Sequence, residues 1–114
     1  MTEYQTKTRK ILRECGAFKD GSHFVYNSGL HGDFYLNKDA LYAHPLKLDD
    51  VCVMLTECAL KTFGRVFDAV VAPATSGIAV GQAVAYNLSL DKREEVLFAF
   101  AERNAEEHRW VFRF

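Results

Sequence analysis

The sequence has no apolar run close to the ~18 residues that a membrane-spanning helix requires. Its first residues, Met1–Gln5, also lack the basic-then-apolar order of a secretory signal. We therefore expect no membrane partner.

Cysteine and histidine are few and scattered. The three cysteines, Cys15, Cys52 and Cys58, form no CxxC motif, and the histidines show neither HxxxH nor HExxH spacing. This odd, scattered set argues against a disulfide framework and against a zinc site. We expect no metal held by the protein and a location in the reducing cytoplasm.

The charge is balanced, with 14 basic and 15 acidic side chains and a formal net charge of −1. Such a balance gives no support to a nucleic-acid partner. A length of 114 residues with 49% hydrophobic residues suits one globular domain, 1–114, with a real core.

Hydrophobic periodicity and turn-forming residues predict an alternating α/β chain. Gly16 and Gly64 are each placed to end a helix, and residues 27–33 are dense in turn formers, which indicates a hairpin. The expected elements are helix 3–14, strands 23–26 and 34–37, helix 48–63, strand 68–72, helix 78–88, and strands 96–101 and 110–114.

Residues 68–101 have the order strand, tight loop, helix and strand, which predicts a βαβ unit. Ligands of open α/β sheets bind at the carboxyl ends of the strands, beside helix N-termini that attract anions. Thr75 and Ser76 add hydroxyl donors there, and Gly77 permits close approach of the backbone. The segment therefore suits a phosphate, or alternatively a simple helix cap.

Two further loops carry polar groups. Residues 27–36 hold the polar groups His31 and Asp33 beside Gly29 and Gly32, and an ordinary turn is their simpler interpretation. Residues 101–109 form a charged segment that we expect to be a loop, and solvated surface is its simpler interpretation. Arg103 in that segment follows a strand end, on the side where the Thr75 loop opens.

The last predicted strand, 110–114, is apolar and has no turn after it. Because it would leave an open sheet edge, we expect the 114 residues to be the first part of a longer domain. The alternative is a small α+β protein that protects this edge by forming a dimer.

Three regions in order resemble orotate phosphoribosyltransferases. Residues 16–18, 23–29 and 34–42 are similar to the N-terminal region of that family, and Val71–Ile78 is similar to its pyrophosphate loop. The segment from Phe100 to Arg113 is similar to the family's next segment. The resemblance implies a type I phosphoribosyltransferase fold, a parallel sheet flanked by helices with an N-terminal hood. It implies hood residues at about 16–45 and a partial βαβ core at about 66–114.

The reaction implied by the resemblance transfers the phosphoribosyl group of phosphoribosyl pyrophosphate (PRPP) to orotate or a related base, with release of pyrophosphate. Mg²⁺ bound with PRPP and cationic groups would stabilise the departing pyrophosphate, so no catalytic side chain is assigned. A homodimer is also implied. Matching positions are Tyr35 and Leu36 for the base, and Asn27, Thr75, Ser76, Gly77 and Arg103 for PRPP or pyrophosphate.

The sequence departs from the family at several positions. Asn27, Asn104 and Glu107 stand where lysines are usual, which leaves the identity of the base open. The Thr-Thr-Gly-Gly loop that cradles the ribose 5-phosphate is absent, so we expect this chain alone to be inactive. Two alternatives stay open, a non-catalytic relative that acts as a binding or regulatory module and a phosphoribosyltransferase for a purine-type base.

Overall fold

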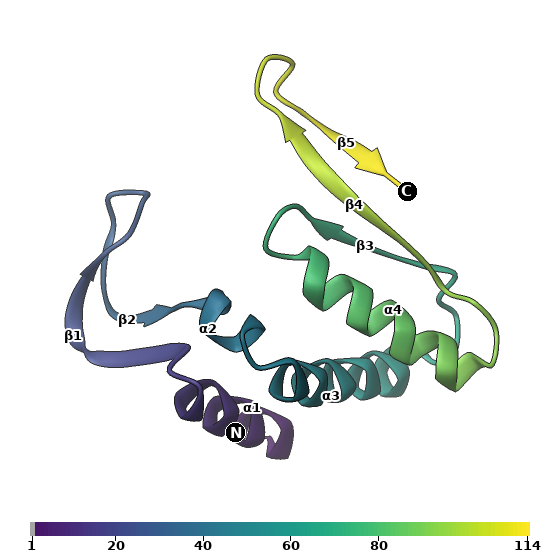
Figure 1. Ribbon diagram of the computed structural model, residues 1–114, viewed down its shortest axis with the longest axis horizontal. Helices are drawn as coiled ribbons and strands as arrows, with labels where there is room; N and C mark the ends of the chain where they lie inside the picture. Colours follow the sequence, from purple (N-terminus) through teal and green to yellow (C-terminus); the bar gives the residue numbers. More distant parts are fainter. Residues whose placement is uncertain (1) are drawn as a thin grey trace. The chain divides into compact units, whose positions relative to one another are not determined.

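The computed structural model describes residues 2–114, which divide into two compact units, 1–51 and 52–114. The expectation of one partial domain with a hood at about 16–45 stays a prediction. Figure 1 shows the order of the elements along the chain. Within the described part of the chain, no helix has the length and apolarity to cross a membrane.

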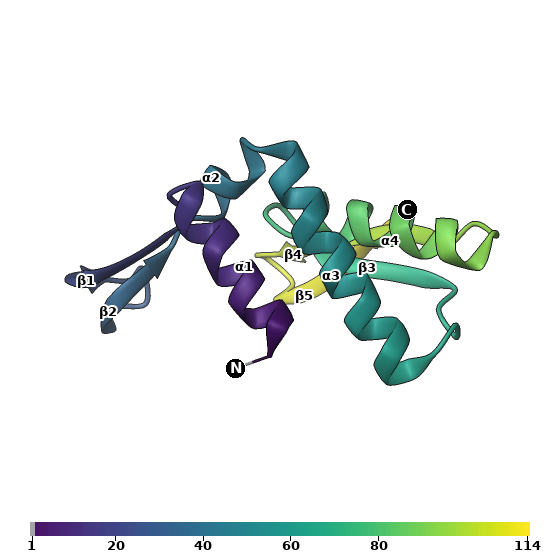
Figure 2. The same cartoon turned by 90° about the horizontal axis from the view of Figure 1, so that it is seen from below.

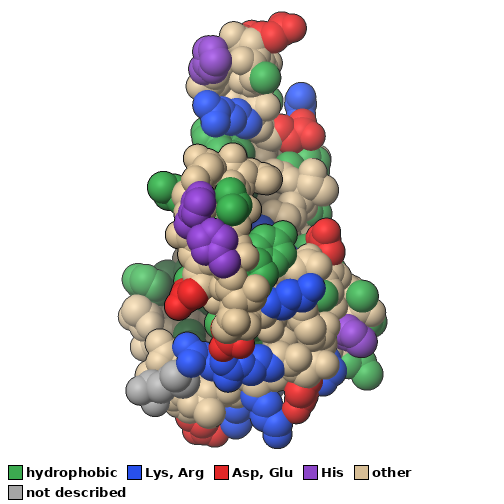
Figure 3. Space-filling view, turned by 90° about the vertical axis from the view of Figure 1, so that its left-hand side faces the viewer, with side chains coloured by type: hydrophobic (Ala, Val, Ile, Leu, Met, Phe, Trp, Pro, Cys, Tyr) green, Lys and Arg blue, Asp and Glu red, His purple; other side chains and the backbone are tan. Residues whose placement is uncertain are grey.

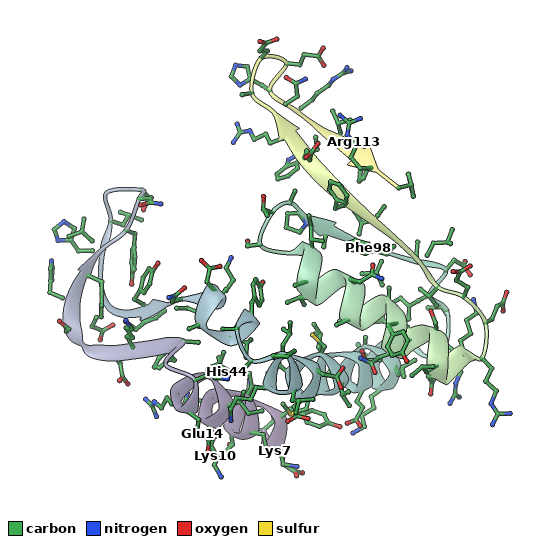
Figure 4. All side chains as sticks on the ribbon, in the orientation of Figure 1. Lys7, Lys10, Glu14, His44, Phe98 and Arg113 are labelled. Carbon is green, nitrogen blue, oxygen red and sulfur yellow. The ribbon has the colours of Figure 1, made fainter. Side chains whose placement is uncertain are left out.

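The first unit begins with α1 (Glu3–Glu14), whose bounds are those predicted. A capping box starts the helix, because the Thr2 side chain accepts from the backbone N–H of Gln5 while the Gln5 side chain accepts from that of Thr2. Near its other end, Glu14 accepts a hydrogen bond from Lys47 at 3.0 Å. Lys10 also lies beside Glu14, at 3.8 Å (Figure 4).

The predicted hairpin is present as β1 (Phe18–Val25) and β2 (His31–Leu36), which pair antiparallel. Both strands begin earlier than predicted. A shift in register between Asp20 and Phe24 lets the polar residues before Phe24 continue the strand, a feature that alternation of side chains does not reveal.

A short helix, α2 (Lys38–Tyr42), was not predicted. The Asn37 side chain caps α2 by accepting from the backbone N–H of Asp39 at 3.2 Å. Pro45 is the first residue of α3 (Pro45–Phe63), a position where its fixed φ and missing N–H cost nothing. The predicted start at Leu48 was therefore three residues late.

The second unit contains β3 (Ala69–Pro73), α4 (Ile78–Lys92), β4 (Leu97–Asn104) and β5 (Arg109–Arg113). Strands β3 and β4 are parallel and α4 connects them, which confirms the βαβ unit (Figure 2). Strand β5 pairs antiparallel with β4, so the three-stranded sheet is mixed.

Helix α4 packs closely on one face of this sheet. A Cβ added to Gly81 would lie 2.6 Å from the Phe98 ring and 2.7 Å from the Cβ of Ala72 (Figure 4). Because Ala72 pairs with Phe100, the side chains of residues 98 and 100 share this face. The core of the unit consists of small and medium apolar residues, among them Val84, Leu88 and Val96.

The opposite face of the sheet carries large apolar side chains that stay exposed. Phe112 pairs with Ala101 and Trp110 pairs with Arg103, so all four lie on the face away from α4. The exposed fractions are 57% for Phe112 and 54% for Trp110. Cys15, Cys52 and Cys58 form no disulfide with one another in the described part of the chain, and Cys52 is buried.

Candidate functional site

The segment between β3 and α4 is the best defined candidate. The backbone N–H of Ala74 donates to the carbonyl of Ala101 at 2.8 Å, which fixes the loop to the neighbouring strand. The peptide bond between Ala74 and Thr75 is cis. The N–H of Gly77 then donates to Pro73 at 2.9 Å, so the chain reverses within five residues and enters α4.

Gly77 is required by this tight reversal. A Cβ at Gly77 would lie 2.6 Å from the carbonyl oxygen of Pro73 and 2.8 Å from the Pro73 side chain. The φ of Gly77 is −83°, which any residue adopts, so the requirement comes from lack of space and not from the backbone angle. The sequence-based reason for this glycine, close approach of the backbone to a bound phosphate, stays a prediction.

The loop presents donors beside a helix N-terminus. The first turn of an α-helix leaves backbone N–H groups without acceptors inside the helix, and the helix dipole adds partial positive charge there. No side chain caps α4 at Gly77. The phosphate site and the simple helix cap therefore both stay predictions. Thr75 is exposed and Ser76 is half-buried, so hydroxyl donors flank the same helix end.

Arg103 lies within β4 and not in a loop, which corrects the expectation for residues 101–109. Strand β4 continues to Asn104 because β5 pairs with its last residues, Arg103 with Trp110 and Asn104 with Arg109. Since Pro73 at the end of β3 pairs with Ala101, Arg103 still lies beyond the same sheet edge as the loop. The structure thus brings Arg103 and residues 74–77 to one edge.

The turn between β4 and β5 is shaped by Asn104. The Asn104 side chain accepts from the backbone N–H groups of Glu106 and Glu107, each at 3.0 Å. Glu107 forms an ion pair with Arg109. Asn104 therefore has a local turn-forming role, and Glu107 neutralises one of the nearby cations.

The remaining predicted site residues lie on the β1–β2 hairpin. Asn27 is exposed in the turn, where the N–H of Gly29 donates to the Tyr26 carbonyl at 2.8 Å. Tyr35 and Leu36 are 43% and 41% exposed near the end of β2. The Tyr35 ring stacks on Phe24 with 5.9 Å between centroids, so this part of the hairpin offers a flat aromatic surface.

Sequence reasoning missed Tyr26, which holds the hairpin together. Its hydroxyl donates to the Phe34 carbonyl at 2.6 Å, and its ring lies where a side chain on Gly32 would point. The glycine at position 32 was the available signal, because a strand glycine often marks close approach of another group. Tyr26 thereby fixes the backbone of Phe34, the residue before Tyr35.

Metal-binding residues do not cluster at these positions. Within residues 2–114, no group of three or more His, Cys, Asp or Glu side chains is arranged to hold a metal ion. The donors at this end of α4 are the hydroxyls of Thr75 and Ser76 and backbone N–H groups of the first helical turn, which suit phosphate oxygens better than a bare cation.

No family model matches the sequence. Curated proteins with similar sequences are orotate phosphoribosyltransferases. The chain is 36% identical over 79 residues to the orotate phosphoribosyltransferase of Caulobacter vibrioides, covering 69% of this chain and 40% of that protein. It is 37% identical over 77 residues to the orotate phosphoribosyltransferase of Methylorubrum extorquens, covering 68% of this chain and 38% of that protein. The chain thus spans about 40% of the length of these curated relatives.

Solved structures agree on the fold. The orotate phosphoribosyltransferase of Aeropyrum pernix is similar with a TM-score of 0.66 and 22% identity, over 91% of this chain and 54% of that one. The orotate phosphoribosyltransferase of Francisella tularensis is similar with a TM-score of 0.65 and 19% identity, over 93% of this chain and 50% of that one. The chain therefore belongs to the orotate phosphoribosyltransferase family and corresponds to the N-terminal portion of its type I phosphoribosyltransferase fold.

Proposed function

We propose that the protein takes part in phosphoribosyl transfer from PRPP to orotate or a related base, with release of pyrophosphate. The observation that carries the proposal is the chain reversal at residues 73–77. It places the N-terminus of α4 directly after the carboxyl end of the parallel strand β3. The curated relatives are named orotate phosphoribosyltransferases, and this chain covers less than half of each. The activity is therefore proposed for the full catalytic unit.

In this proposal the diphosphate of PRPP binds at residues 75–77. Backbone N–H groups at the start of α4 and the hydroxyls of Thr75 and Ser76 donate to its oxygens. Arg103 lies at the same sheet edge and supplies a guanidinium, which pairs with phosphate in a bidentate manner. These donors stabilise the negative charge that grows on pyrophosphate as the C–O bond to the ribose breaks.

We propose that Mg²⁺ enters with PRPP and is held chiefly by phosphate oxygens and water. This is the usual arrangement for Mg²⁺ at phosphate-transfer sites, because the ion gives up its water reluctantly. Bound there, it would neutralise charge on the leaving pyrophosphate.

The base is proposed to bind against Tyr35 and Leu36. The stacked rings of Phe24 and Tyr35 offer a surface for a planar heterocycle, and Tyr26 holds the preceding backbone. Asn27, which we propose to contact PRPP, is the neutral counterpart of the usual lysine, so it donates a hydrogen bond without a full charge. A purine-type base stays the second candidate.

A homodimer is also proposed. The exposed Trp110 and Phe112 lie beside Arg103 on the sheet face opposite α4, and such apolar surface favours association. Covering these rings with a second copy would bury Arg103 in the interface, near the site it serves. A non-catalytic binding module, the other alternative, would use the same face without turnover. We also propose a reducing, cytoplasmic location, because the number and spacing of the three cysteines do not suit a disulfide framework.

The test is a pyrophosphate-release assay on the full catalytic unit with PRPP, Mg²⁺ and a panel of bases. We expect turnover with orotate, or with one related base, that falls when Thr75 and Ser76 are both replaced by alanine. Turnover only with a purine base would move the assignment to the second candidate. Tight PRPP binding without turnover of any base would support the non-catalytic alternative.

A further inference from the structure

His23 and His31 form a close pair across the β1–β2 hairpin. Their ring centroids are 4.8 Å apart, and the ring planes are inclined by 76°. Val25 pairs directly with His31, and His23 lies two residues before Val25, so both imidazoles project from one face of the hairpin. Histidine side chains accordingly lie next to one another on the surface (Figure 3).

This spacing fits two imidazoles bound to one ion. With a metal–nitrogen distance of about 2.0–2.1 Å, each ring centroid lies about 3.2 Å from the metal. If the nitrogen–metal–nitrogen angle is about 90–109°, the two ring centroids are then about 4.5–5.2 Å apart. The observed 4.8 Å falls inside this interval, so little movement of either strand is needed.

The surroundings leave room for an ion and its water. A shallow, open hollow is lined by Gly21, Ser22, His23, His31, Gly32 and Asp33. The Asp33 carboxylate adds negative charge on the same side of β2 as His31, two residues away. Within residues 2–114 neither imidazole has a hydrogen-bond or ion-pair partner, so its nitrogens are not committed elsewhere.

We propose that His23 and His31 form a two-histidine site for a divalent transition-metal ion of the Zn²⁺, Ni²⁺ and Cu²⁺ class. Imidazole is a preferred ligand for these ions, whereas Mg²⁺ and Ca²⁺ prefer oxygen. Since the described residues hold no cluster of three ligands, the protein supplies two ligands and water completes the coordination. The site is separate from the Mg²⁺ that we expect to accompany PRPP, and it does not depend on phosphoribosyl transfer.

Binding has a structural consequence. An ion held by His23 on β1 and His31 on β2 links the two strands on either side of the turn at 26–30. The bound ion therefore stabilises the folded hairpin, and the gain in the free energy of unfolding increases with the logarithm of the free ion concentration once this exceeds the dissociation constant.

The test is isothermal titration of the 114-residue chain with Ni²⁺ and, separately, Zn²⁺, using the variants His23→Ala and His31→Ala. We expect one saturable site, and at least about a tenfold loss of affinity in each variant, because the second ligand binds as an intramolecular event. The matched controls are His44→Ala and His108→Ala, which should leave the affinity unchanged. Binding that survives in both test variants would be assigned to thiols such as Cys15 and would overturn the proposal.

A second measurement needs no substitution and so avoids variants that fail to fold. Substoichiometric Cu²⁺ added to the isotopically labelled chain should broaden the NMR signals of residues 21–24 and 31–33 first, because the paramagnetic effect is local. Broadening that begins elsewhere, or none at one equivalent of Cu²⁺, contradicts a site at His23 and His31.

Discussion

The backbones of Gly77 and Pro73 are in direct contact: the N–H of Gly77 donates to the Pro73 carbonyl at 2.9 Å, and no Cβ fits between them. This contact closes the reversal that turns β3 into the start of α4. The proposed diphosphate site depends on it, because the donors of residues 75–77 are positioned by the same reversal.

Replacing Gly77 by alanine should open the reversal. The added Cβ would lie 2.6 Å from a backbone oxygen, which cannot move aside as a flexible side chain does. We expect the free energy of unfolding to fall by roughly 1–3 kcal/mol, as for overpacking elsewhere. Denaturant titration measures this change. Gln82→Ala, an exposed change on the same helix, should stay within about 0.5 kcal/mol, and an equal loss in both variants would contradict the packing argument.

Gly81→Ala tests the contact between α4 and the sheet. Its Cβ would meet the Phe98 ring at 2.6 Å and the Cβ of Ala72 at 2.7 Å, so we expect a loss of roughly 1–3 kcal/mol despite alanine's higher helix propensity. Adding Phe98→Leu should recover part of the loss, since only the Phe98 contact is relieved. Thermal unfolding of the single and double variants measures the coupling, and strictly additive losses would contradict it.

The pKa of Glu14 is lowered, first by its hydrogen bond from Lys47 and then by the charge of Lys47, with a smaller effect of Lys10. A lowered carboxyl pKa contributes stability above the unfolded-state pKa, and this stability is lost as the pH falls through the folded-state pKa. We expect Lys47→Gln to raise the Glu14 pKa clearly and Lys10→Gln to raise it less. Carbon-13 NMR titration of the Glu14 carboxyl gives both values, and the reverse order would contradict the assignment.

Arg103 and Arg113 form a matched pair for testing the anion site. Arg103 lies at the edge that holds residues 74–77, whereas Arg113 pairs with Phe100 and forms an ion pair with Glu102 at 3.3 Å. In the full catalytic unit, Arg103→Gln should weaken PRPP binding by roughly tenfold or more, because a charged hydrogen bond to phosphate is lost. Arg113→Gln should have little effect. An equal loss of PRPP affinity in the two variants would show that only net charge matters and would contradict a specific role for Arg103.

Local residues predicted most of the fold. The bounds of α1 were correct because its apolar stripe and the glycine that follows it, Gly16, are local signals, and the βαβ unit was correct because the apolar runs and the break at residues 73–77 are local too. The errors involved pairing with distant residues. Strand β4 extends through Arg103 because Trp110 pairs with it, and β1 starts at Phe18 because Leu36 pairs with it. Such partners are not visible in a short window of sequence.

The sequence pointed most directly to those candidate site residues that are neighbours along the chain. Thr75, Ser76 and Gly77 are adjacent in sequence, so one motif identified them. Tyr26 was missed because its role depends on the Phe34 carbonyl and on the space at Gly32, which only the folded hairpin brings together. The α2 helix was missed because five residues with a single asparagine cap give too weak a periodic signal.

The most direct test of the central claim is an NMR titration of the isotopically labelled chain with magnesium pyrophosphate. The account predicts saturable shifts of the backbone N–H signals of residues 75–80 and of the Arg103 side chain, which are absent or much weaker in Gly77→Ala. Saturation with shifts confined to other parts of the chain, or identical titrations of the two proteins, would contradict a diphosphate site at the start of α4.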